Sequence, residues 1–295
     1  MSRNQPHQES PRPRAFAVTD RSGEPLSIVA DVWGPNDGRP VLLIHGGGQT
    51  RHSWAGTARA LAARGWQAIA YDQRGHGQSG RSPSADYEPV RFAQDLAEIA
   101  AQLDAAPVVV GASLGGIAAM VAEGELAPGS LAALVLVDIT PRMERAGVDR
   151  IVGFMLDRAE AGFESLDEAA DAVAAYQPHR RRPENHDGLR KNLRLDDDGR
   201  WRWHWDPALF TSPTGLGAVP GPATGRLDEA AAKVTVPTLL VRGKLSDLVS
   251  EETARHFLEI VPHAEFVDVT DAGHMVAGDQ NDRFSDAVLE FLARV

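Results

Sequence analysis

The sequence predicts an α/β fold, with a mostly parallel sheet of about eight strands that is flanked by helices and interrupted by an inserted, mainly helical cap. Short runs rich in β-branched residues alternate with longer stretches rich in Ala and Leu, which is typical of strands and the helices that cover them. One connection between strands is far longer than a parallel crossover requires. The 295 residues, 43% hydrophobic and 24% charged, have the composition of a soluble, packed protein.

The first predicted elements are two strands joined by a turn at 21–25, which together form an antiparallel hairpin. Residues 1–14 precede them, contain no apolar stretch and are expected to form a flexible tail. The expected strands are 15–19, 26–33, 41–44, 67–71, 107–110, 131–139, 237–242 and 265–269. The expected helices between and after them are 54–64, 92–103, 115–126, 251–260 and 281–294.

The long connection is residues 140–236, where about a dozen residues would suffice for a crossover. We expect a cap (lid) subdomain here, with residues 15–139 and 237–295 forming the core. Helical pieces are predicted within 142–176 and a hairpin at 193–205. In that hairpin Trp201, Trp203 and Trp205 alternate with other residues, so their indoles can share one side of a strand. They are expected to line an apolar substrate pocket or to pack the cap against the core.

Charge and composition exclude several classes of function. Lys and Arg number 30 against 41 Asp and Glu, so the net charge of −11 disfavours nucleic acid and anionic membrane surfaces as partners. The chain has no Cys, which removes thiolate catalysis, zinc–thiolate sites and disulfides. It also lacks a signal-peptide pattern and any apolar run of about 18 residues, so we expect a cytoplasmic protein.

No cofactor or metal is expected from the motifs. The run 75–80 matches the glycine pattern of a dinucleotide fingerprint, but it leads into a loop where that fingerprint requires a helix. The acidic run 196–198 lacks the spacing and the terminal Glu of a calcium loop. A small molecule is therefore the expected partner, and the oligomeric state is left open.

A nucleophilic serine is predicted at the turn from strand 107–110 to helix 115–126. The segment Gly111-Ala112-Ser113-Leu114-Gly115 has the pattern G-x-S-x-G. Glycines on both sides permit a sharp turn that leaves the Ser113 hydroxyl above the carboxyl edge of the sheet. Such a short pattern is weak by itself, and its place between a buried strand and a helix is what makes it informative.

Two backbone amides are expected to stabilise a developing oxyanion. The amide of Leu114 lies at a helix N-terminus, where unpaired N–H groups and the helix dipole favour negative charge. The second donor is expected from the sequence His-Gly-Gly-Gly at 45–48, because glycines let the backbone approach a substrate closely. Gly47 is the favoured donor and Gly48 the neighbouring possibility.

These features together resemble the serine hydrolases of the α/β-hydrolase fold. The likeness extends from about residue 26 onward and includes the glycine loop at 45–48, the segment DQRGHGQS at 72–79, the turn at Ser113 and the chain order Ser, Asp, His. It implies a general base after the last strand, where His274 lies, and a carboxylate after strand 237–242, where Asp247 lies. Asp138, which ends strand 131–139, is the alternative acid that some relatives use.

The predicted activity is hydrolysis of a carboxylic ester of a small, hydrophobic molecule through an acyl-enzyme intermediate. Ser113, Asp247 and His274 would form the catalytic triad. Hydrolysis of lactones, thioesters or carbon–carbon bonds, and cofactor-free haloperoxidase or perhydrolase chemistry, would use the same triad. Epoxide and haloalkane hydrolases are disfavoured, because the resemblance implies Asp where Ser113 stands. A ligand-binding module without catalysis is a less favoured interpretation.

Overall fold

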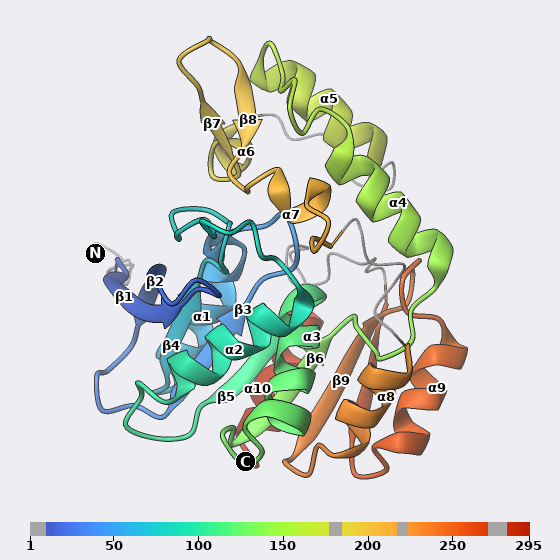
Figure 1. Cartoon of the computed structure of the whole chain (residues 1–295). Helices are drawn as coiled ribbons and strands as arrows, with labels where there is room; N and C mark the ends of the chain where they lie inside the picture. Colours follow the sequence, from blue (N-terminus) through green and yellow to red (C-terminus); the bar gives the residue numbers. More distant parts are fainter. Residues whose placement is uncertain (1–9, 177–184, 217–223, 271–281) are drawn as a thin grey trace, which may run out of the picture.

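A computed structural model of the chain, which describes residues 10–176, 185–216, 224–270 and 282–295, contains the predicted sheet with helices on both faces (Figure 1). The strand order is β1-β2-β4-β3-β5-β6-β9-β10, in which β2 pairs antiparallel with both neighbours and every other pair is parallel. The strands are β1 (Arg12–Thr19), β2 (Pro25–Trp33), β3 (Pro40–Ile44), β4 (Gln67–Tyr71), β5 (Val108–Ala112), β6 (Ala133–Val137), β9 (Thr238–Gly243) and β10 (Glu265–Val269).

Strand β1 begins earlier than the sequence predicted. Arg12 pairs with Val32 and Arg14 with Ala30, within the residues expected to form a flexible tail. The Arg12 guanidinium also donates a hydrogen bond to the carbonyl of Gly34 at 2.7 Å. These residues gave no strand signal because an edge strand with charged, solvent-facing side chains lacks the apolar alternation of a half-buried strand.

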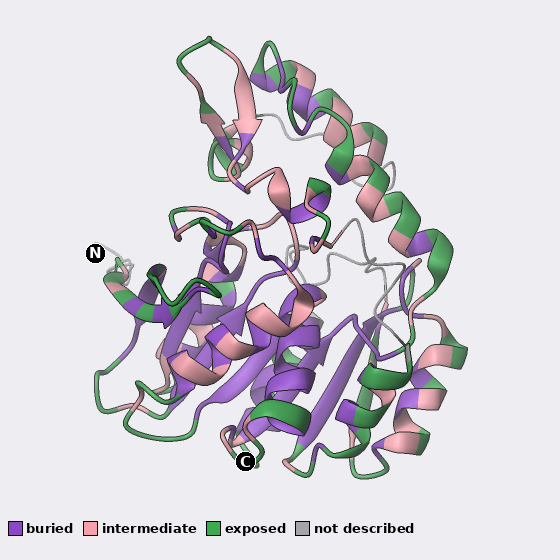
Figure 2. Cartoon of the chain, in the orientation of Figure 1, coloured by how far each residue is buried: buried purple, intermediate pink, exposed green. Residues whose placement is uncertain are grey.

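The central strands are buried on both faces, as a parallel sheet between two helix layers requires. In β3, Leu42 and Ile44 belong to one apolar cluster and Val41 and Leu43 to the other, because successive side chains point to opposite faces. The burial colouring in Figure 2 shows these strands as a continuous buried layer.

Helices supply the other half of each apolar cluster. The first cluster is covered by α2 (Pro89–Ala100), α3 (Leu114–Val121), α8 (Thr224–Ala232) and α9 (Glu251–Ile260). The second is covered by α1 (Ala55–Ala62) and α10 (Asp282–Leu292). The short helical turns η1 (Arg51–Trp54) and η2 (Ala122–Leu126) precede α1 and follow α3. Helix α8 lies within the expected cap, yet its Leu227 and Ala231 join the first cluster together with side chains of α3 and α9.

A separate layer is formed by the described residues between β6 and α8, which we call the inserted segment (Figure 1). Its elements are α4 (Arg145–Leu156), α5 (Leu166–Tyr176), α6 (Asp187–Arg190), β7 (Leu193–Leu195), β8 (Trp201–Trp203) and α7 (Ala208–Thr211). Strands β7 and β8 pair antiparallel, which confirms the predicted hairpin. The segment packs in a third apolar cluster, which it shares with Tyr87, Phe92 and Leu114 of the core.

The tryptophans of the hairpin pack within that cluster. Trp203 is 7% exposed and its ring meets Phe163 edge to face, with 5.4 Å between centroids. Trp205 is 2% exposed and meets Phe210 in the same manner at 5.2 Å. Both side chains therefore contribute to the packing of the inserted segment.

No helix in the described parts of the chain is long and apolar enough to cross a membrane.

Candidate active site

Ser113 occupies a strained turn between β5 and α3. Its backbone has φ 48° and ψ −115°, a left-handed conformation that costs a non-glycine residue about 1–3 kcal/mol. The chain has no room for side chains beside it: a methyl group on Gly111 would lie 2.6 Å from the carbonyl oxygen of Gly115, and one on Gly115 would lie 2.7 Å from that of Ile44. The two glycines of the motif are thus required by close backbone approach, and they hold the serine at the N-terminus of α3.

The glycine loop at 45–48 lies directly beside this turn. A methyl group on Gly46 would lie 3.2 Å from Cβ of Ser113, and one on Gly47 would lie 4.0 Å from a methyl carbon of Leu114. The structure therefore brings together the predicted serine and both segments from which oxyanion donors were expected.

The three glycine amides of this loop differ in their hydrogen bonds. The amide of Gly46 donates to Oε1 of Gln49, and the amide of Gly48 donates to Nε2 of His76, each at 3.0 Å. The Gly47 amide has no hydrogen-bond partner among the described residues. Between the two candidates from the sequence, Gly47 is therefore the residue with a donor left for a ligand.

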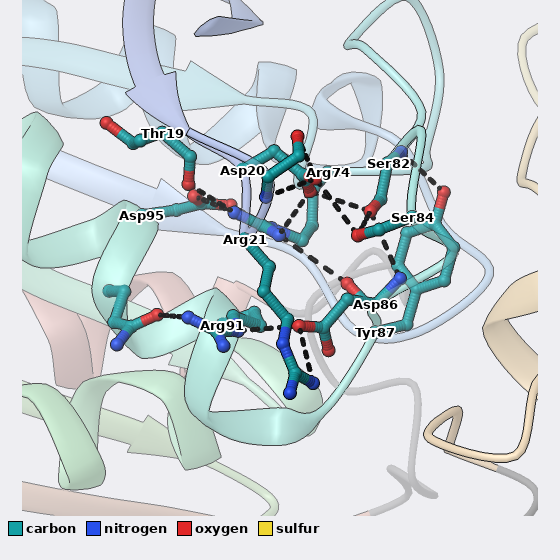
Figure 3. A network of polar contacts seen from close by, with 12 residues as sticks. Thr19, Asp20, Arg21, Arg74, Ser82, Ser84, Asp86, Tyr87, Arg91 and Asp95 are labelled. Atoms are coloured by element: carbon teal, nitrogen blue, oxygen red, sulfur yellow. Dashed lines mark hydrogen bonds and ion pairs between the residues drawn. The ribbon is translucent and has the colours of Figure 1, made fainter. Parts of the chain in front are cut away.

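The loop that carries His76 is anchored by a buried ionic network (Figure 3). Arg74, which is fully buried, donates two hydrogen bonds of 2.6 Å to the carboxylate of Asp95, and its Nη1 lies 3.6 Å from Oδ1 of Asp20. Burial raises the pKa of Asp95 to about 6, and the hydrogen bonds from Arg74 oppose that rise. The Asp20–Arg74–Asp95 contacts connect the entry hairpin, the 72–79 loop and α2.

The same loop contacts the inserted segment. The amide of Asp206 donates to the carbonyl of Gly75 at 2.7 Å, and the hydroxyl of Tyr87 donates to the Asp206 carboxylate at 2.7 Å. Because Asp206 follows Trp205, these bonds attach the inserted segment to the loop at 72–79 and to Tyr87.

Asp247, the acid preferred from the sequence, faces the inserted segment. Its Oδ2 lies 2.6 Å from Nη1 of Arg150 on α4, and its side chain is 37% exposed. The backbone carbonyl of Asp247 also packs against Gly147 of the same helix, where a side chain would collide with it. The surroundings of Asp247 thus include a cationic partner from the inserted segment.

Asp138, the alternative acid, is fully buried next to the turn at Ser113. It follows Val137, whose carbonyl accepts a hydrogen bond from the amide of Ser113 at 3.2 Å. Its own backbone has φ 49°. The carboxylate accepts hydrogen bonds from the amide of Gly243 at 2.9 Å and from Oγ of Ser246 at 2.6 Å.

The predicted base, His274, lies in 271–281, outside the described residues. The structure therefore describes the predicted nucleophile Ser113, the candidate oxyanion donors and both candidate acids. Within the described ranges, no cluster of three or more His, Asp or Glu side chains is placed to hold a metal ion.

Comparison with known proteins agrees with the topology. Residues 39–279 match the model of the alpha/beta hydrolase fold family. The chain belongs to this family.

Several named proteins are similar to this alpha/beta hydrolase over most of their length. "Esterase Rv0045c" of Mycobacterium tuberculosis is 32% identical over 260 residues, covering 86% of this chain and 82% of that protein. "Non-heme chloroperoxidase CPO-A1" of Kitasatospora aureofaciens is 29% identical, with 93% and 98% covered. A crystal structure of an alpha/beta hydrolase from Novosphingobium aromaticivorans has a TM-score of 0.80 at 27% identity, with 97% and 99% covered.

Sequence reasoning missed the contact between His76 and the glycine loop. The sequence assigned no role to His76, although the segment 72–79 that contains it is part of the resemblance. The bond joins residues 28 positions apart on two loops, and no periodicity or spacing in the sequence reports such a contact. The only available signal was that both loops follow neighbouring parallel strands, β3 and β4, whose carboxyl ends meet at one edge.

Proposed function

We propose that this alpha/beta hydrolase cleaves carboxylic esters through an acyl-enzyme intermediate formed on Ser113. His274 takes the proton of the serine hydroxyl as Oγ attacks the ester carbonyl, and then gives it to the leaving alcohol. The amides of Leu114 and Gly47 stabilise the oxyanion of the tetrahedral intermediate. Water, activated by His274, then attacks the acyl-enzyme and releases the acid.

The observation that carries this proposal is that the glycine loop lies beside Ser113, with Gly46 next to its Cβ, and that the Gly47 amide of this loop has no partner among the described residues. The serine is held in a strained conformation at a helix N-terminus, where the first amides of a helix have no partner within it. The glycine loop adds the amide of Gly47, whereas the amides of Gly46 and Gly48 already donate to Gln49 and His76. Such a pair of donors beside a serine suits an oxyanion rather than a neutral ligand.

For the third member of the triad, the geometry favours Asp138 over Asp247. A triad acid must accept from the histidine and stabilise its cationic form, which is most effective for a carboxylate shielded from water. Asp138 is buried and oriented by Gly243 and Ser246, whereas Asp247 is partly exposed and paired with Arg150. We therefore propose Asp138 as the acid and assign Asp247 to the attachment of α4.

The apolar side chains that cover the glycine loop support a small, hydrophobic substrate. A methyl group on Gly48 would collide with the terminal atoms of Met155 and would lie 3.7 Å from Nε1 of Trp205. Both side chains belong to the apolar cluster that also contains Leu114. The inserted segment thus covers the oxyanion loop with apolar groups and acts as a cap in this proposal.

The test is intact-mass spectrometry after exposure to a fluorophosphonate, together with release of p-nitrophenol from p-nitrophenyl acetate and butyrate. We expect one adduct on the wild type, none on Ser113→Ala, and a loss of turnover on the order of 10⁴-fold or more in that variant. Circular dichroism should show Ser113→Ala to be folded. Ester cleavage that persists in the folded variant would disprove the role of Ser113.

Perhydrolysis is a second candidate, favoured by the similarity to a non-heme chloroperoxidase over 93% of this chain. An acyl-enzyme can transfer its acyl group to hydrogen peroxide in place of water, which gives a peracid. Assays with acetate, hydrogen peroxide and bromide would detect it, because the peracid oxidises bromide to hypobromite, which then brominates a phenolic dye. Activity here that depends on Ser113 and exceeds ester hydrolysis would make peracid formation the main reaction.

A further inference from the structure

Two buried histidines cross-link the glycine loop at 45–48 to the loop at 72–79. His45 accepts a hydrogen bond from the amide of Gln73 at Nε2, at 3.0 Å, and His76 accepts one from the amide of Gly48 at Nε2, at the same distance. The two rings meet edge to face with 5.0 Å between their centroids. Each histidine therefore bonds to the loop that carries the other one.

The partners of these rings determine their tautomers. A backbone amide can only donate, so Nε2 of His76 must carry a lone pair, while Nδ1 faces the carbonyl of Arg74 at 3.0 Å and must carry the proton. The same reasoning gives His45 a proton on Nδ1, which donates to the carbonyl of Gly46 at 2.7 Å. Both rings are neutral in this arrangement, because a proton on Nε2 would point at the backbone N–H that donates to that nitrogen.

These bonds hold the two peptide groups on either side of Gly47. His45 holds the carbonyl oxygen of the Gly46–Gly47 peptide, whose other polar group is the Gly47 amide. His76 holds the N–H of the next peptide, between Gly47 and Gly48. A glycine has no side chain to restrict its own backbone, so the direction of the Gly47 N–H depends on such external contacts.

We propose that His76 is a positioning residue for the oxyanion hole, which it serves by accepting the Gly48 amide and so directing the Gly47 amide toward the reacting carbonyl. The inference rests on the proposed function of Ser113 and adds to it the residue that orients the second donor. The histidine does not touch the substrate. Nδ1 of its ring contacts the backbone carbonyl of Arg74, and the side chain of Arg74 is held in turn by the buried carboxylate of Asp95.

The electrostatic surroundings of His76 keep it neutral, so they favour a positioning role over that of a general base. Burial, followed by the charge that His45 would carry, lowers the pKa of His76 to about 3, although the Arg74 carbonyl and Asp72 act in the opposite direction. His76 is therefore neutral throughout the range in which a serine hydrolase is assayed. Its replacement should change the rate without moving the pH at which the activity is half-maximal.

The test compares His76→Phe, which keeps the ring without any acceptor, with His76→Gln, whose Oε1 can accept from the Gly48 amide. For p-nitrophenyl butyrate we expect kcat of the Phe variant to fall about 10²-fold, the loss typical of removing or displacing one oxyanion donor. KM should change less than about threefold, because the donor acts mainly in the transition state. The Gln variant should recover most of kcat.

Glu123→Ala is the matched control for a general loss of stability. Glu123 is buried and accepts hydrogen bonds from the amides of Gly129 and Leu131, and among the described residues neither partner belongs to the glycine loop. Its kcat should equal that of the wild type at temperatures where it is folded. A folded His76→Phe with wild-type kcat, a loss confined to KM, or a Gln variant as impaired as Phe would overturn the proposal.

A second measurement keeps the proposal testable should His76→Phe not fold. In the wild type, nitrogen-15 NMR at pH 7 should show the Nδ1–H tautomer of His76, and the Gly48 amide should be protected from hydrogen exchange. An Nε2–H tautomer would overturn the proposal, since that nitrogen could not accept. If the wild type forms no fluorophosphonate adduct, the proposed function fails instead, and the NMR result still reports on the contact.

Discussion

Oγ of Ser246 donates a hydrogen bond of 2.6 Å to Oδ2 of Asp138, across the ends of two neighbouring parallel strands. The same hydroxyl accepts the amides of Leu248 and Val249, so its proton is directed to the carboxylate. The loop after β9 therefore turns Ser246 toward the buried edge, while the next residue, Asp247, reaches Arg150 on the inserted segment.

This arrangement gives opposite expectations for the two acids. Asp138→Asn should lower kcat for p-nitrophenyl butyrate on the order of 10⁴-fold, because an amide cannot stabilise the histidine cation. Asp247→Asn should leave kcat within about threefold of the wild type. Steady-state kinetics of both folded variants decide the matter, and the reverse pattern would restore the triad preferred from the sequence.

The bond between Tyr87 and Asp206 should contribute to the stability of the attached segment. Tyr87→Phe leaves the Asp206 carboxylate and the Ser82 amide without the hydroxyl that joins them, at a cost of about 1–3 kcal/mol. Tyr176→Phe is the control, since that hydroxyl has no hydrogen bond among the described residues. Urea unfolding measures both, and equal midpoints would contradict a role for the Tyr87 hydroxyl.

Trp203 should matter chiefly for packing. Trp203→Ala removes a side chain that meets both Phe154 and Phe163, and we expect the free energy of unfolding to fall by about 3–5 kcal/mol. Trp201→Ala, at a half-buried position beneath Arg190, should cost less. Thermal unfolding followed by circular dichroism gives the comparison. Wild-type stability in Trp203→Ala, with altered kinetics alone, would indicate a substrate contact in place of packing.

Acid should destabilise the protein partly through His76. Its pKa falls from about 6.5 in the unfolded chain to about 3 in the folded one, so between these values the unfolded state binds a proton that the folded state does not. Stability from this residue is complete above pH 6.5 and is lost as the pH falls toward 3, with a slope of up to about 1.4 kcal/mol per pH unit.

The measurement is urea unfolding of the wild type and of His76→Gln from pH 7.5 to 4. Carboxylates titrate in both proteins, so the difference between the two curves isolates His76. We expect the variant to lose less stability than the wild type on acidification. Parallel curves would mean that His76 has an ordinary pKa in the folded protein.

The sequence by itself determined the strand and helix order, the turn at Ser113 and the glycine loop beside it. These are local features: the continuous apolar run of β3 indicates a strand buried on both faces, periodicity fixes which face of α2 is buried, and Gly111 and Gly115 are required by the backbone geometry of one turn. The signals fail where a residue acts through a distant partner. Arg12 joins an edge strand, and α8 packs on the sheet, although neither carries a pattern that says so.

Only the tertiary structure provides a reason to favour Asp138 over Asp247 as the proposed acid, and Gly47 over Gly48 as the proposed donor. Asp138 and Asp247 both follow strands at the same edge of the sheet, so spacing cannot distinguish them. What separates them is burial and the partner each carboxylate finds, Ser246 in one case and Arg150 in the other. Likewise, the Gly48 amide is engaged because His76 reaches it from another loop, and such contacts arise when the folded chain satisfies its buried polar groups.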